Sequence, residues 1–142
     1  MGALLSGCGS IDPGQDFQVA QVVFDAGYYY CSVEPMLFAQ RCGSGEDGES
    51  GQCHFNVTSF NLSSYSPLVG DRCNGVNPGN QAIPGEAQAN YQAAQRHMRT
   101  NPELAELLLR PTKQLAHPRQ IFETRSRQAD VVREWATRYS SQ

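Results

Sequence analysis

Residues 33–42 read VEPMLFAQRC, and the dipeptide Cys53-His54 follows after a spacer of ten residues. The first part has the pattern of an amphipathic helix. Ser32 can cap its start, and an acidic side chain and a proline then lie in the first turn. The apolar residues of this helix share one face, and they are Val33, Met36 and Leu37. We therefore expect a helix that delivers Cys42 at its end.

The spacer between the two cysteines has no residue that could build a core. Residues 43–51 read GSGEDGESG, which is typical of an acidic loop held between two fixed sulfur atoms. Covalent haem attachment needs two thiols, which add across the porphyrin vinyl groups, and an imidazole directly after the second thiol to ligate the iron. The usual spacer is shorter, at two residues. Cys42, Cys53 and His54 nevertheless have the chemistry of an attachment site.

These residues resemble the start of single-haem c-type cytochrome domains of bacteria, in which a helix with the pattern V-x-P-x-L leads into Cys…Cys-His. The end of the chain resembles the same family. Residues 101–111 read NPELAELLLRP, and His117 and a last helix containing residues 130–135 follow. The matches cover roughly residues 28 to 138 in the family's order. The resemblance implies an all-α, cytochrome-c-like fold, with a few short helices and long loops wrapped around one covalent haem c.

The resemblance also implies the ligands of the iron. His54 is the proximal ligand, and His117, in a loop where Pro118 restricts the backbone, is the distal one. Met98 is the alternative sixth ligand, since it lies on the apolar stripe of an expected helix beside His97. A His/His pair keeps the iron low-spin and closed to small ligands, which suits electron transfer, whereas His/Met raises the potential.

Helical periodicity and capping residues predict three further helices. The first covers residues 86–100. The second begins at the cap and proline of residues 101–103 and ends at Pro111, with a stripe formed by Leu104, Leu107 and Leu108. The last covers about residues 126–139. Between His54 and the first of these helices, residues 55–85 are rich in Asn, Ser, Gly and Pro and predict long ordered loops.

The start of the chain has the pattern of a bacterial lipoprotein. Residues 5–8 read LSGC, the small-residue cleavage pattern in which the thiol of Cys8 is lipidated. The apolar run before it is short, so we infer a truncated or misplaced start. An ordinary N-terminus with a free cysteine is the alternative. We interpret residues 1–27 as the lipoprotein-type N-terminus and tether, and residues 28–142 as the cytochrome-c-like domain.

If Cys8 carries lipid and two cysteines hold haem, Cys31 and Cys73 remain to form a disulfide. This disulfide implies an oxidising compartment outside the cytoplasm. The alternative is two disulfides in one of three pairings and no cofactor.

The composition excludes several classes of partner. The chain has 142 residues, enough for one domain, and a net charge of −3. Its 11 basic residues form no cluster, so neither nucleic acid nor an anionic membrane surface is an expected partner. No stretch approaches transmembrane length. Neither zinc-ligand spacing nor a nucleophile signature is visible.

We therefore expect an electron carrier rather than an enzyme. It would be anchored by lipid to a bacterial membrane, in the periplasm or at the cell surface. Its partner would be a redox protein or a larger respiratory or photosynthetic assembly. The alternative is a haem-free, disulfide-stapled lipoprotein that binds a partner protein. A third possibility is a haem domain with an open sixth position, which senses a ligand or performs peroxidase-like chemistry.

Overall fold

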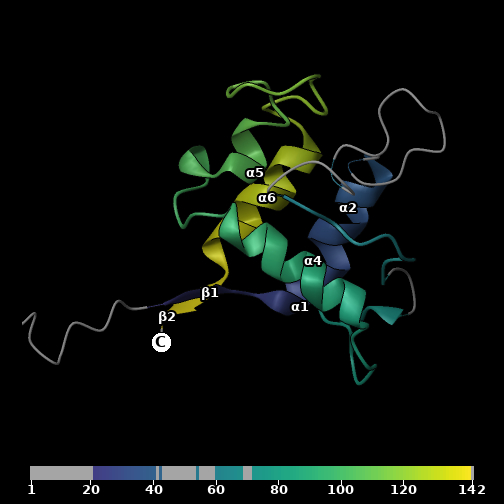
Figure 1. Cartoon of the computed structure of the whole chain (residues 1–142). Coiled ribbons are helices and arrows are strands. Elements are labelled where there is room, and N and C mark those ends of the chain that lie inside the picture. The colour runs from purple at the N-terminus through teal and green to yellow at the C-terminus, as the bar shows by residue number, and fades with distance from the viewer. Residues whose placement is uncertain (1–20, 41, 43–53, 55–59, 69–71, 142) are drawn as a thin grey trace, which may run out of the picture.

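The computed structural model describes residues 21–40, 42, 54, 60–68 and 72–141. This part of the chain is mostly helical, with long loops and one small sheet (Figure 1). The sheet was not expected, so the fold is not purely α-helical. In chain order the elements are β1 (Val22–Phe24), α1 (Ala26–Tyr28), the π-helix η1 (Tyr29–Val33), α2 (Glu34–Ala39), α4 (Gly85–Arg96), the 3-10 helix η3 (Pro102–Leu104), α5 (Glu106–Leu109), α6 (Arg127–Thr137) and β2 (Tyr139–Ser141).

The first three helical elements form one continuous helix, because the backbone stays helical where they join. The side chain of Asp25 caps its start and accepts a hydrogen bond from the Tyr28 N–H at 3.0 Å. Ser32 therefore lies inside the helix and does not cap it. The π-helical turn comes directly before Pro35, which has no N–H and whose ring clashes with the preceding turn. A wider turn accommodates this proline.

A disulfide joins this N-terminal helix to the segment before α4. Cys31 in η1 is bonded to Cys73, with their Cα atoms 5.8 Å apart. The sequence analysis expects this disulfide if Cys8 carries lipid and two other cysteines hold haem. Cys42 carries a free, buried thiol, so the structure does not contain the alternative with two disulfides.

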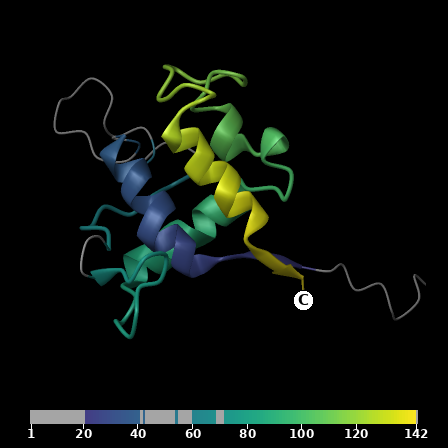
Figure 2. The same ribbon diagram turned by 180° about the vertical axis from the view of Figure 1, so that it is seen from behind.

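The two ends of the described chain pair with each other. Strands β1 and β2 lie side by side (Figure 2) and pair in antiparallel direction, with Phe24 opposite Tyr139. Folded structure thus begins before residue 28, inside the segment expected to be a tether. Helix α6 ends at Thr137, so Tyr139 belongs to the sheet and not to the predicted last helix. The hydroxyl of Ser126 caps α6 by accepting from the Ala129 N–H at 3.2 Å.

The core is centred on Trp135 of α6, a helix that packs against the N-terminal helix (Figure 2). Its ring centre lies 5.1 Å from that of Tyr29, 5.6 Å from that of Phe24 and 6.2 Å from that of Tyr91. The indole N–H donates to the backbone carbonyl of Asp25 at 2.8 Å. Trp135 therefore connects α6, α4 and the N-terminal helix.

Helices α4 and α5 differ in how closely they follow the prediction. Tyr91, Ala94 and Met98 are buried, as the sequence predicts, but α4 ends at Arg96 and Met98 follows it, so the predicted helix to residue 100 is too long. The helix predicted to start at residues 101–103 and to end at Pro111 is broken at Ala105, whose backbone is extended. It therefore divides into η3 and α5. The break changes the helical phase. Leu107 and Leu108 are buried, whereas Leu104 is 65% exposed and does not belong to the stripe.

Candidate functional site

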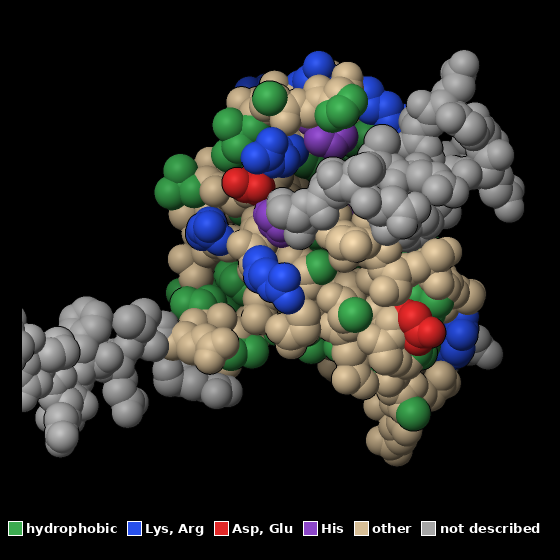
Figure 3. Space-filling view, in the orientation of Figure 1, with side chains coloured by type: hydrophobic (Ala, Val, Ile, Leu, Met, Phe, Trp, Pro, Cys, Tyr) green, Lys and Arg blue, Asp and Glu red, His purple; other side chains and the backbone are tan. Residues whose placement is uncertain are grey.

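All three histidines of the chain lie in one cluster with Phe60. The ring centre of Phe60 is 4.9 Å from that of His54 and 5.5 Å from that of His97. His117 lies on His54, with ring centres 6.1 Å apart. Histidine side chains reach the surface beside charged groups in Figure 3. The cluster thus brings together segments that are far apart in the sequence.

The two histidines singled out as iron ligands are neighbours in space. The planes of the His54 and His117 imidazoles are inclined by only 18°. His117 lies in the loop between α5 and α6, and His54 lies before the described loop of residues 60–68. The structure therefore presents two near-parallel imidazoles from parts of the chain that are far apart in the sequence.

Backbone carbonyls hold both rings. Nδ1 of His54 is 2.9 Å from the carbonyl oxygen of Phe60, and Nδ1 of His117 is 2.6 Å from that of Arg119. A carbonyl oxygen only accepts, so both Nδ1 atoms carry a proton and donate. A neutral ring of this tautomer has its lone pair on Nε2, the atom that then ligates a metal.

The surroundings of His54 favour its neutral form. Burial lowers the pKa of this imidazole, and the charges of His117 and His97 lower it further. The hydrogen bond to Phe60 acts in the opposite direction and raises the pKa. Since burial is the largest of these effects, His54 stays available as a neutral metal ligand at physiological pH.

His97 has a different set of contacts. Its Nδ1 is 3.1 Å from a carboxylate oxygen of Glu106, and the same oxygen is 3.1 Å from Nε of Arg110. These two partners lower the pKa of Glu106, with Arg110 the stronger. His97 is therefore held toward α5 and contacts the edge of the Phe60 ring. The sequence interpretation placed it beside Met98 but did not predict this cluster.

Cys42 lies close to the same region. It follows the end of α2, and its N–H donates to the carbonyl of Leu37 at 3.0 Å. Burial raises the pKa of its thiol to about 12, and the charge of Arg119 lowers it. Arg119 also supplies the carbonyl that holds His117. The free thiol is thus protonated at neutral pH and lies near the loop that carries His117.

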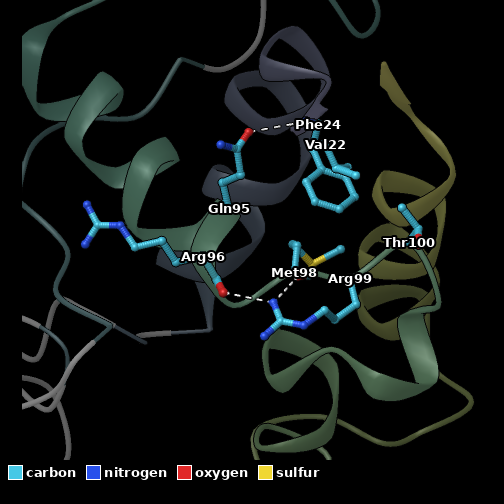
Figure 4. A pocket seen from close by; sticks show the side chains of 7 residues that line it. All are labelled: Val22, Phe24, Gln95, Arg96, Met98, Arg99 and Thr100. Carbon is cyan, nitrogen blue, oxygen red and sulfur yellow. Dashed lines mark hydrogen bonds between the residues drawn. The ribbon is translucent and has the colours of Figure 1, made fainter. Parts of the chain in front are cut away.

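Met98, the alternative ligand, faces a different part of the molecule. Its side chain lines a pocket of about 320 Å³ together with Val22 and Phe24, at the junction of β1 and the end of α4 (Figure 4). The guanidinium of Arg99 lies over this pocket and donates to the Met98 carbonyl at 2.5 Å. The adjacent residues His97 and Met98 therefore have different neighbours, and His97 is the one near His54.

A buried carboxyl group is the feature that sequence reasoning missed. Glu34 is fully buried, and it accepts hydrogen bonds from the Tyr65 hydroxyl and, at 2.8 Å, from Nδ2 of Asn90. Burial raises the pKa of this carboxyl from its ordinary 4.5 to about 7, against the effect of both hydrogen bonds. The sequence contains a signal for this burial, because Glu34 lies one helical turn before the buried Leu37.

Two predicted site residues, Cys8 and Cys53, lie outside the described residues. Within the described part of the chain, no three or more His, Cys, Asp or Glu side chains are grouped to hold a metal ion alone. None of the helices described there is long and apolar enough to cross a membrane.

Comparison of the chain with protein-family models, with curated proteins and with solved structures found no match. The assignment of function therefore depends on the chain's own residues. Of the predicted cofactor-binding residues, the structure describes His54, His117 and Cys42.

Proposed function

We propose that this protein is a c-type cytochrome with a cytochrome-c-like fold, one covalent haem c and a role in electron transfer outside the cytoplasm. The His54–His117 pair carries the proposal. Its ring centres are 6.1 Å apart, and its planes are nearly parallel. Neutral imidazoles are common iron ligands in haem proteins. His54 and His117 would therefore be the residues that hold the haem iron.

Each of the predicted residues has a role in this proposal. His54 and His117 would hold the iron, and Cys42 and Cys53 would form the thioethers. The free, protonated thiol of Cys42 is consistent with this, since a disulfide would have consumed it. The haem supplies one-electron redox chemistry when bound.

The hydrogen bonds of the two imidazoles support an electron carrier. Donation from Nδ1 to a carbonyl raises the basicity of an imidazole and fixes its orientation. Two such ligands favour low-spin iron with no open position, which suits electron transfer more than ligand sensing or peroxidase chemistry. Because both carbonyls belong to the chain's own loops, the ligand orientation depends on the folding of these loops.

The cellular location follows from the cysteines. A disulfide between Cys31 and Cys73 supports an oxidising compartment. A lipid on Cys8 would anchor the protein to a bacterial membrane, in the periplasm or at the cell surface. The partner would be a redox protein or a larger electron-transfer complex.

The test is expression of the chain in a bacterial periplasm with a competent haem-maturation system. Denaturing electrophoresis with haem staining should give a coloured band, and the spectrum should be that of six-coordinate, low-spin haem. The double variant Cys42→Ser, Cys53→Ser should lose the colour, whereas the double variant Cys31→Ser, Cys73→Ser should keep it in whatever protein accumulates. A colourless wild-type band would contradict the proposal and support the haem-free lipoprotein.

A further inference from the structure

Glu34 lies at one end of a chain of hydrogen bonds that leads to His54. Its Oε1 accepts from Nδ2 of Asn90 at 2.8 Å. The Asn90 amide also pairs with both backbone groups of Ser63: Nδ2 donates to the carbonyl at 3.0 Å, and Oδ1 accepts from the N–H at 2.5 Å. Asn90 is fully buried, so it holds Ser63 and Glu34 in one fixed arrangement.

Ser63 belongs to the loop that positions His54. The neighbouring Leu62 donates its N–H to the His54 carbonyl at 2.7 Å. Phe60 supplies the carbonyl to which Nδ1 of His54 donates, at 2.9 Å. Residues 60–63 therefore hold both the backbone and the ring of His54, while Asn90 holds this loop against α4.

We infer that Glu34 is a positioning residue for His54, and that gain or loss of a proton on Glu34 changes the orientation of the His54 ring. The contacts carry the effect through Asn90 and residues 60–63. Because the iron-ligand role of His54 belongs to the proposed function, our inference rests on that function. Glu34 itself does not touch the cofactor ligands named above.

Protonation must rearrange the hydrogen bonds of Glu34. In the ionised form both carboxylate oxygens accept, one from Asn90 and one from the Tyr65 hydroxyl. A proton on Oε2 requires this hydroxyl to turn from donor to acceptor. The bond from Asn90 also loses its charge assistance, which weakens the hold of Glu34 on the Asn90 amide. Tyr65 is only half-buried, so the proton can exchange with water.

None of the groups that face Glu34 titrates near neutral pH, so Glu34 is the group that does. Tyr29 and Tyr30 face it from its own helix, and Tyr65 faces it from the loop. Burial raises the pKa of all three phenols above 10, so they stay neutral. Helix α4 contributes the uncharged Asn90, and Arg72 acts on Tyr65. The pKa of Glu34, at about 7, lies in the physiological range.

The test follows three signals of the full-length protein from about pH 5 to pH 9. Infrared absorption of the buried carboxyl reports Glu34. Nuclear magnetic resonance of the reduced protein reports the Ser63 amide and the Phe60 carbonyl carbon. Electron paramagnetic resonance of the oxidised protein reports the orientation of the axial ligands. We expect all three to change with one midpoint near pH 7.

Four variants separate positioning from simple stability. Glu34→Gln has nearly the same size but no titrating proton, so the shared transition should vanish. Glu86→Gln removes an exposed carboxyl of α4 and should keep it. Tyr65→Phe removes a donor to the ionised form and should move the midpoint to higher pH. Asn90→Ala should keep the infrared transition and lose the change at Phe60 and in the paramagnetic spectrum.

A change of the Ser63 and Phe60 signals with a midpoint near pH 7 that persists in Glu34→Gln overturns the inference. So does a wild-type infrared transition that leaves Ser63 and Phe60 unmoved, a result that needs no folded Asn90 variant. If the chain proves to hold no haem, the proposed function fails. The infrared, Ser63 and Phe60 signals then still decide whether Glu34 controls the His54 contact. In that case the Glu34→Gln variant gives the titration of His54, which is subtracted from the wild-type signals.

Discussion

The Trp135 core and the histidine cluster are stabilised in different ways. Trp135 is fully buried, and the rings of Phe24, Tyr29 and Tyr91 surround it. The burial of apolar rings contributes a large stabilisation that does not depend on their precise orientation. In the histidine cluster, loop carbonyls of Phe60 and Arg119 instead hold the Nδ1 atoms of His54 and His117. Packing therefore provides the stability of the fold, and hydrogen bonds to irregular backbone provide the orientation of the site.

The largest effect should come from removal of the central aromatic ring. Trp135→Ala leaves a cavity among three rings and removes the indole N–H that donates to the Asp25 carbonyl, and it should cost about 3 to 5 kcal/mol. Urea unfolding followed by circular dichroism measures this loss. Leu104→Ala is the matched control, since its side chain is 65% exposed and it should change stability by less than about 0.5 kcal/mol. Equal effects of the two changes would remove the distinction between core and surface.

The disulfide should stabilise the fold without orienting the histidines. Cys31 and Cys73 are separated by 42 residues. On the chain-entropy model, loss of such a cross-link costs roughly 3 to 4 kcal/mol. The double variant Cys31→Ala, Cys73→Ala should lose about this much in denaturant unfolding, and its haem spectrum should be unchanged while it is folded. Mapping of unreduced peptides should find the two cysteines joined. Alkylation of either in the native oxidised protein would contradict this pairing.

The pH dependence of stability should report Glu34. Its pKa is about 7 when folded and near 4.5 when unfolded. Between these values the folded state binds more protons, so its contribution is fully present below pH 4.5 and is lost as pH rises through 7. The loss should be roughly 3 kcal/mol. Glu34→Gln should flatten this part of the profile. A wild-type profile parallel to that of the variant would show that Glu34 ionises at its ordinary pKa.

The variant His117→Ala should have a small effect on stability and a large effect on the proposed iron site. His117→Ala removes a half-buried loop side chain, so unfolding should change by less than about 1 kcal/mol. The iron of the haem-bound protein should nevertheless become open to carbon monoxide. His97→Ala should leave the iron closed.

Met98→Ala should destabilise the core by about 2 to 5 kcal/mol with the same ligand spectrum. Loss of a sulfur-ligation band in Met98→Ala would instead assign the sixth position to Met98.

The parts of the site that the sequence indicated were those with a local pattern. Cys53-His54 and the loop around His117 stand out from their neighbours in the chain, and the structure places His54 and His117 side by side. His97 has no such local mark, and the position of Glu34 one helical turn before Leu37 indicates burial but not its partners. His97 enters the cluster through Phe60 and Glu106, and Glu34 is buried by Tyr65 and Asn90, which are 31 and 56 residues away.

The sequence by itself determined the mostly helical character, the cap at Asn101, and the burial of Tyr91, Ala94 and Met98. Periodicity and capping act within a few residues, so they are legible in the chain. Only the tertiary structure decided the early start of the first helix and the pairing of Phe24 with Tyr139. These features depend on contacts across the whole chain, such as the bond from Trp135 to the Asp25 carbonyl over 110 residues. Local sequence patterns do not predict such contacts, because they form only between segments that the folded chain brings together.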